Sequence, residues 1–177
     1  MKPGAEVFGR ITASLAAGGE EARVSHGALV VNLAPTAFAA AARTLKTEFA
    51  FDIFLDVTAV DWPGQDPRFE VVWHFYSTAH KVRVRLKARV PESNPRVASL
   101  TPLYGSAAFM ERECHDMYGI VFEGNADLRP ILLYEGFVGH PLRKDYPKDR
   151  EQPLVPYREV EERAGTDVDA PWERSGK

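Results

Sequence analysis

The sequence predicts an α+β fold: a two-layer α/β sandwich with a mixed, largely antiparallel sheet, followed by an extended C-terminal tail. Residues 69–76 and 81–90 alternate between apolar and polar side chains, as half-buried strands do, and residues 38–49 place apolar side chains along one helical stripe. The chain has 177 residues, of which 45% are hydrophobic and 27% charged, so one globular domain is expected.

A helix and a hairpin are predicted at the N-terminus. Apolar residues recur at helical spacing over residues 7–15, and Gly18 follows as a residue type that ends helices. Residues 22–25 and 29–33 then flank a turn at Gly27, which predicts two short antiparallel strands.

A second helix follows, with Thr36 in the position of its N-terminal cap, where a Thr side chain accepts a hydrogen bond from a free backbone N–H. Its stripe is rich in alanine, so the helix is expected to pack closely on the sheet. The residues of the stripe are Phe38, Ala41, Ala42, Leu45 and Phe49.

Three strands come next, and the second and third are predicted to form a hairpin. A period of two also runs through residues 53–59, so this segment is expected to join the sheet. In the hairpin, a four-residue turn over residues 77–80 sets the register and puts Glu70 opposite Lys87. The predicted apolar pairs are Phe75 with Val82, Trp73 with Val84, and Val71 with Leu86.

Five cations share the polar face of the third of these strands: Lys81, Arg83, Arg85, Lys87 and Arg89. A nucleic-acid interface is disfavoured because the face has few aromatic side chains on which bases could stack. The favoured interpretation is a solvated strand face whose charges resist edge-to-edge aggregation. An acidic protein partner is the alternative.

Further along, a short helical piece is expected over residues 96–100. A longer helix is predicted from its cap Ser106 to Tyr118, with Gly119 as its C-terminal stop.

This helix carries four charges within six residues, namely Glu111, Arg112, Glu113 and Asp116. Phe109, Glu113 and Met117 share one stripe, which favours a buried charge network over a solvated helix with i,i+4 ion pairs. The expected counter-charges are Arg129, Arg143 and Lys144.

Composition excludes several classes of function. A formal net charge of −3 and a pI near 6.0 remove the global positive field of a nonspecific nucleic-acid binder. No apolar run approaches the roughly 20 residues of a membrane span, and the N-terminus does not resemble a signal peptide, so a cytosolic protein is expected. A single cysteine, Cys114, can supply neither an internal disulfide nor the thiolates of an iron–sulfur cluster.

Reactive side chains do not form a recognisable catalytic or metal motif. Cys114 and His115 are helical neighbours of Asp116 and point about 100° apart, so these three cannot form a relay among themselves. The possible metal ligands His115, Asp116, Asp127 and His140 do not have the sequence spacing of a known metal-binding motif. Surface or capping roles are therefore favoured for these side chains. No glycine-rich phosphate loop is present, so nucleotide binding is not expected.

Two segments of the second half form a specific pair of motifs. Residues 111–120 read Glu-Arg-Glu-Cys-His-Asp-Met-Tyr-Gly-Ile, and residues 139–147 read Gly-His-Pro-Leu-Arg-Lys-Asp-Tyr-Pro. With the order of elements before them, they resemble the C-subunit family of NADH-quinone oxidoreductase, respiratory complex I, over residues 5–150. The signature residues, expected to serve the fold or its interfaces, are Glu111, Arg112, Glu113, Asp116, Gly119, Asp127, Arg129, Gly139, His140, Pro141, Arg143, Lys144, Asp145 and Tyr146.

Two positions depart from that family's pattern. Asn125 stands where the family usually has His or Lys, and Pro130 stands where a second Arg is common. The contact that this basic residue makes in other members of the family therefore cannot be carried over to this chain.

The resemblance implies a noncatalytic structural subunit of a hydrophilic arm, on the cytoplasmic side of the bacterial inner membrane. It implies no cofactor in this chain, with FMN, the iron–sulfur clusters and the quinone pocket in partner subunits of a proton-translocating complex. The equivalent subunit of a membrane-bound energy-converting hydrogenase is an alternative. A stand-alone cytosolic enzyme using Cys114 or His115 is another.

The domain is expected to span residues 1–147 and to include both motifs. Residues 148–177 combine prolines and charges of both signs with few large apolar side chains, which is typical of an extended segment that does not fold alone. We expect it to bind partner subunits, with Tyr157 and Trp172 as anchors.

Overall fold

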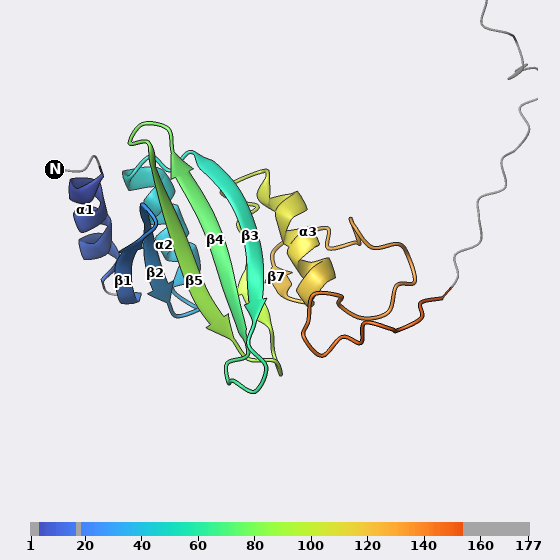
Figure 1. Ribbon diagram of the computed structural model, residues 1–177. Coiled ribbons are helices and arrows are strands. Elements are labelled where there is room, and N and C mark those ends of the chain that lie inside the picture. The colour runs from blue at the N-terminus through green and yellow to red at the C-terminus, as the bar shows by residue number, and fades with distance from the viewer. Residues whose placement is uncertain (1–3, 17–18, 154–177) are drawn as a thin grey trace, which may run out of the picture.

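The computed structural model describes residues 4–16 and 19–153 of the chain (Figure 1). A five-stranded sheet has the order β1-β2-β5-β4-β3, in which β2 and β5 are parallel and the other neighbours antiparallel. Its strands are β1 (Gly19–Ser25), β2 (Ala28–Leu33), β3 (Ile53–Asp61), β4 (Phe69–Ser77) and β5 (Val82–Val90). The predicted α+β class with a mixed, largely antiparallel sheet is confirmed.

The remaining elements are three helices and a small second sheet within the described residues. The helices are α1 (Ala5–Leu15), α2 (Phe38–Glu48) and α3 (Ala107–Tyr118), and the short parallel strands are β6 (Arg96–Ala98) and β7 (Val121–Glu123). In Figure 1, α2 lies behind the large sheet and α3 lies beside the edge strand β3.

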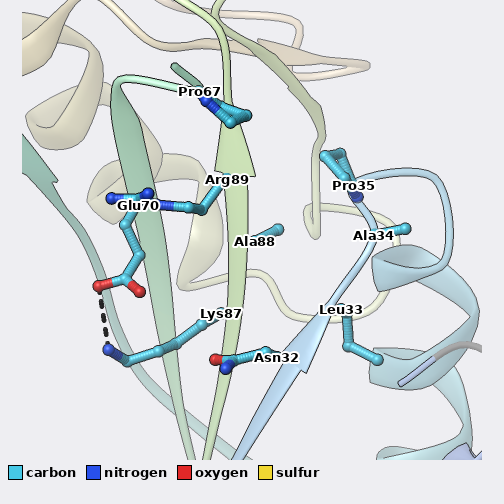
Figure 2. Close-up of a pocket in the computed structure, with 9 residues that line it drawn as sticks. All are labelled: Asn32, Leu33, Ala34, Pro35, Pro67, Glu70, Lys87, Ala88 and Arg89. Carbon is cyan, nitrogen blue, oxygen red and sulfur yellow. Dashed lines mark hydrogen bonds and ion pairs between the residues drawn. The ribbon is translucent and has the colours of Figure 1, made fainter. Parts of the chain in front are cut away.

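The β4–β5 hairpin forms, but its register differs from the predicted one by two residues. The observed pairs are Phe75 with Val84, Trp73 with Leu86, and Val71 with Ala88. The turn lies one residue later than expected, with Lys81 at a φ of 54° and its N–H donating to the Ser77 carbonyl at 2.8 Å. Glu70 therefore pairs with Arg89 in register, and its ion pair with Lys87 (3.0 Å) is diagonal (Figure 2).

A bulge in β3 interrupts the predicted period of two. Phe54 pairs with Phe75 and Asp56 pairs with His74, so Leu55 is the extra residue. Phe54 is buried, whereas Ile53 and Leu55 are 39% and 38% exposed. Only the second half of the expected apolar set, Val57 and Ala59, faces the core.

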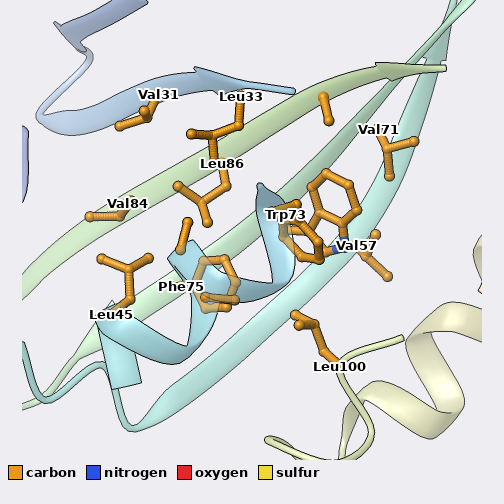
Figure 3. Packing of buried hydrophobic residues seen from close by; sticks show 14 of the residues in the cluster. Val31, Leu33, Leu45, Val57, Val71, Trp73, Phe75, Val84, Leu86 and Leu100 are labelled. Carbon is orange, nitrogen blue, oxygen red and sulfur yellow. The ribbon is translucent and has the colours of Figure 1, made fainter. Parts of the chain in front are cut away.

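The core lies between one face of the sheet and α1, α2 and the segment that leads to α3 (Figure 3). Trp73 is fully buried and stacks on Phe38 of α2, with ring centroids 3.7 Å apart and planes inclined by 19°. Tyr104 extends the core beyond α2, because its ring contacts Phe75 and its hydroxyl donates to the Phe51 carbonyl at 2.8 Å.

The opposite face of the sheet carries the cations of β5. Because β5 lies between β2 and β4, it is not an edge strand, and the interpretation that these charges protect an edge is wrong. Among the described residues, no helix crosses the face of the sheet turned to the viewer in Figure 1, the face opposite α2.

Three further local predictions are wrong or incomplete. Residues 96–100 contain strand β6 instead of a helical turn, because β6 pairs with the distant β7. Thr36 does not cap α2, whose N-cap is Ala37 and has no side-chain hydrogen bond, and Ser106 precedes α3 without capping it through its side chain. The predicted role of Gly18 lies outside the described residues.

Candidate functional site

The C-terminal end of α3 is capped by the second motif. The last four carbonyls of an α-helix have no partner within the helix. Here each accepts one hydrogen bond: His115 O from Gly119 N (2.7 Å), Asp116 O from His140 Nδ1 (2.9 Å), Met117 O from Leu142 N (3.1 Å) and Tyr118 O from Arg143 Nε (2.7 Å). A carbonyl can only accept, so His140 carries a proton on Nδ1. The positive charge of Arg143 also suits this end of the helix dipole.

Gly119 is required where the two motifs meet. Its φ of 74° is left-handed, and a Cβ atom there would collide with the His140 imidazole and come within 2.6 Å of the Arg143 guanidinium. A side chain at this position would therefore displace residues 131–147, which we call the capping segment.

Asp116 holds the segment that follows Pro130. Its side chain is buried, and its Oδ2 atom accepts the N–H groups of Ile131, Leu132 and Leu133 at 2.8, 2.9 and 3.3 Å. The carboxylate thus fixes three consecutive residues that lie in no helix or strand.

Arg112 binds the same segment from another position of α3. It donates to the carbonyls of Arg129 (2.8 Å) and Pro130 (2.9 Å). The departure at Pro130 leaves this contact intact, because the group used is a backbone carbonyl that any residue supplies.

Glu111 is the most deeply buried charge of the motif, with no exposed surface. Its carboxylate accepts hydrogen bonds from the Leu100 N–H (2.6 Å), the Ser99 hydroxyl (2.7 Å) and the Asn125 side-chain amide (2.9 Å). Burial raises the pKa of Glu111, and these three hydrogen bonds oppose the rise. In this chain, a neutral amide at Asn125 contacts the buried carboxylate.

The predicted inward stripe of α3 is wrong. Glu113 is exposed, and Phe109 is 62% exposed. The buried positions are Ala107, Glu111, Cys114 and Asp116. Small and sulfur-containing side chains at 107 and 114 define the inward face, and the two carboxylates are buried because backbone and neutral side-chain donors surround them.

The predicted counter-charges bind elsewhere. Within the described residues, none of Arg129, Arg143 and Lys144 forms an ion pair with Glu111 or Asp116. Arg129 pairs with Asp127 at 2.9 Å and lowers the pKa of that carboxyl. Lys144 contributes its backbone N–H, which donates to Asp61 at 2.7 Å.

Arg68 is a hub that the sequence did not indicate. It is 8% exposed and forms a bidentate pair with Asp61 at 2.7 and 2.8 Å, and it also contacts Glu92 at 2.7 Å and Asp145 at 3.0 Å. Its hydrogen bonds lower the pKa of both Asp61 and Asp145. Asp145 belongs to the second motif, so the hub ties the capping segment to the β3–β4 loop.

Contacts of the capping segment continue past the predicted boundary at Pro147. The Gln152 side chain hydrogen-bonds to the Val138 N–H and carbonyl at 3.0 and 3.1 Å and also to the Tyr146 hydroxyl. The Tyr134 hydroxyl donates to the Pro153 carbonyl at 3.2 Å.

A pocket of about 200 Å³ lies between α3 and the segments it holds. Its walls are His115, Asp116, Leu128, Pro130, Leu133, Tyr134, Gly136, Phe137, Gly139 and His140. The two histidine rings are 6.1 Å apart, and each donates from Nδ1 to a main-chain carbonyl. Burial lowers the pKa of His140. In residues 4–16 and 19–153, no three His, Cys, Asp or Glu side chains lie close enough to hold a metal ion.

Cys114 does not have the surroundings of a nucleophile. It is 2% exposed, and burial strongly raises the pKa of its thiol. Reactive cysteines need a stabilised thiolate and access to substrate, so this position favours packing.

The segments around α3 expose several large apolar side chains. We call this set the signature apolar surface; it consists of Phe109, Ile131, Leu132, Tyr134, Val138 and Leu142, which are 38% to 62% exposed. Exposed apolar side chains concentrated in one part of a chain are typical of protein interfaces.

No helix among the described residues is both long and apolar enough to cross a membrane. Comparison with known families matches residues 31–152 to "Respiratory-chain NADH dehydrogenase, 30 Kd subunit".

Two similar sequences carry the same name. The C subunit of NADH-quinone oxidoreductase from Xanthobacter autotrophicus is 39% identical over 163 residues, covering 85% of this chain and 78% of that protein. Its counterpart in Rhodopseudomonas palustris is 38% identical over 182 residues, and the match covers 96% of this chain and 91% of that protein.

Two solved structures are also similar. The trypsin-resistant fragment of Nqo5 superposes with a TM-score of 0.60 and 30% identity, covering 70% of this chain and 97% of the fragment. The second is a chain of the membrane-bound sulfane sulfur reductase, an archaeal respiratory membrane complex. It superposes with a TM-score of 0.65 and 26% identity, covering 73% of this chain and 76% of that chain.

We predict that Arg68→Ala destabilises the isolated protein by about 3 kcal/mol, because it leaves the buried Asp61 carboxylate without its counter-charge. The matched control is Arg129→Ala, which removes an exposed partner of Asp127 and should change stability little. Urea unfolding measures both. Equal stabilities of the two variants would show that the Arg68 hub does not hold the capping segment.

We predict that the stability advantage of the unaltered chain over Glu111→Gln falls as the pH rises. A raised pKa means that the folded state binds the proton more tightly than the unfolded state. The resulting stability is present below the usual value of 4.5 and is lost as the pH rises through the raised value of the folded state. Urea unfolding from about pH 4 to about pH 7 tests this sign. Glu113→Gln, on the exposed side of α3, is the control for the loss of one charge. If the stability advantage over Glu111→Gln grew as the pH rises, the raised pKa of Glu111 would be contradicted.

Proposed function

The chain belongs to the family of the 30 kDa subunit of respiratory-chain NADH dehydrogenase, and we propose that it is a structural subunit of the hydrophilic arm without an active site of its own. Electron transfer from NADH to quinone, coupled to proton translocation, belongs to the assembled NADH-quinone oxidoreductase. The observation that carries this proposal is the use of charged signature groups within the fold: the buried Glu111 and Asp116 and the exposed Asp145 each bind donors of the same chain.

The cofactors are assigned to partner subunits. The single cysteine of the chain supports this assignment, because an iron–sulfur cluster is held by several cysteine thiolates. The same assignment places FMN and the quinone pocket outside this chain.

The signature apolar surface is proposed as the site that meets the cluster-bearing and quinone-pocket subunits. Burying side chains such as Phe109 and Leu132, which are 62% and 60% exposed, would remove apolar area from water on assembly. Through these partners the protein would lie on the cytoplasmic side of the bacterial inner membrane.

The equivalent subunit of a membrane-bound energy-converting hydrogenase is the second candidate. The likeness to a chain of an archaeal respiratory membrane complex favours it, since this fold also occurs in a complex with a different name. The similar sequences that carry the name NADH-quinone oxidoreductase favour the first candidate.

We predict that a tagged copy purified from native membranes recovers NADH-dehydrogenase subunits. The same chain purified alone should show no visible absorbance band and no stoichiometric zinc by elemental analysis. Recovery of hydrogenase subunits would support the second candidate, and recovery of no partner would contradict both. A bound flavin or metal in the isolated chain would contradict the assignment of the cofactors to other subunits.

We propose that the tail beyond the domain binds partner subunits. Because Gln152 and Pro153 still contact the capping segment, the test is a chain that ends at Pro153. It should keep its melting temperature and lose most of its recovery in the complex, because residues 154–177 would supply binding and not the core. An unfolded variant, or one that assembles at the normal level, would contradict this role.

A further inference from the structure

The outer face of the five-stranded sheet concentrates positive charge in a chain whose formal net charge is −3. We call it the cationic sheet face; its cations are Arg23 of β1 and Arg83, Arg85, Lys87 and Arg89 of β5. Register places Arg23 and Arg85 in one row on either side of Val30, so they share a face with the other β5 cations. The carboxylates on the same face are Glu21, Asp56 and Glu70.

Most of these cations lack an acidic partner within the described chain. Lys87 pairs with Glu70 at 3.0 Å, and Arg89 donates to the neutral Gln65 at 2.9 Å. No carboxylate in residues 4–16 and 19–153 forms an ion pair with Arg23, Arg83 or Arg85. The face therefore offers three guanidinium groups for external acceptors.

The position of β5 removes the ordinary structural explanation. Charged side chains on an edge strand prevent aggregation, but β5 is the central strand of its sheet. Central strands are usually apolar on both faces when both are covered, so this face is built to remain open or to meet a polar partner.

The cationic sheet face also has side chains typical of a protein interface, and a pocket adjoins it. Arg89 lies over the ring of Trp62, which is 40% exposed, with its guanidinium carbon 5.7 Å from the ring centroid. Arg and Trp are enriched where proteins meet. The adjoining pocket has a volume of about 330 Å³. Its walls include Asn32, Pro67 and Lys87 (Figure 2).

We propose that the cationic sheet face is a docking site for an extended acidic segment of a neighbouring subunit. The inference rests on the proposed function, because the neighbour is a subunit of the same complex. Alternate residues of a strand are spaced by roughly 6.6 Å, so carboxylates at alternate positions of an extended segment along β5 would match Arg83 and Arg85. Guanidinium and carboxylate groups form bidentate pairs, which sets the register of such a segment.

The half-buried His74 lies on this face, paired in register with Arg85. Burial and then the neighbouring Arg85 lower the pKa of His74, while Asp56 in the same row raises it. Arg83 and Lys87 add to the lowering.

The test uses cross-linking in the intact complex. Arg83→Lys and Arg85→Lys keep the charge and introduce an amine that a zero-length carbodiimide reagent couples to a carboxylate in direct contact. Mass spectrometry is expected to find both positions joined to Asp or Glu of another subunit. Arg43→Lys, at an exposed position of α2, is the control and is expected to give no such product. Products confined to this chain, or equal products at the control position, would overturn the inference.

Charge reversal provides the second measurement. Arg83→Glu with Arg85→Glu should lower recovery of the neighbouring subunit by about tenfold, because like charges would then face each other. The control pair Arg10→Glu with Arg43→Glu changes the net charge equally at exposed positions of α1 and α2. It should leave recovery of the neighbouring subunit unchanged. Equal recovery with both pairs would overturn the inference while leaving the proposed function intact. Recovery of no NADH-dehydrogenase subunit by the unaltered chain would overturn both.

Discussion

The structure around α3 depends on the hydrogen-bonding need of four carbonyl groups at the end of that helix. Gly119 satisfies the first, and the other three accept donors from His140, Leu142 and Arg143, more than twenty positions later in the chain. Meeting this need fixes a segment that has no regular structure of its own. The same segment then reaches the sheet through the contact of Asp145 with the Arg68 hub.

This arrangement gives the charged motif of α3 a structural use. A buried carboxylate costs free energy unless donors surround it, and here the donors are backbone N–H groups and neutral side chains of loops. Through these hydrogen bonds, Asp116 and Glu111 hold long loops in place against α3. Separately from these contacts, the described chain exposes two distinctive sets of side chains, the signature apolar surface and the cationic sheet face. A protein with both is suited to hold neighbouring subunits together.

Sequence periodicity predicted the helices, the main strands and the end of α3 at Gly119, because these features depend on local residue order. It missed the hairpin register, since a shift of two residues keeps every side chain on its own face. It also missed the bulge at Leu55 and strand β6, which depend on pairing partners. On α3 it selected Glu113 instead of Glu111, because the donors that make burial of a carboxylate possible come from distant loops. Nothing local marks Arg68, whose partner Asp145 lies 77 positions away.

Amide hydrogen exchange in the isolated protein shows whether the capping segment is held by the chain itself. The N–H groups of Ile131, Leu132, Leu142 and Lys144 lie outside helices and strands but are bound to α3 or to Asp61. We predict that they exchange at least about a hundredfold more slowly than unprotected amides, as groups in stable hydrogen bonds do. Exchange at unprotected rates would contradict this prediction, because the capping segment would then be fixed only by partner subunits.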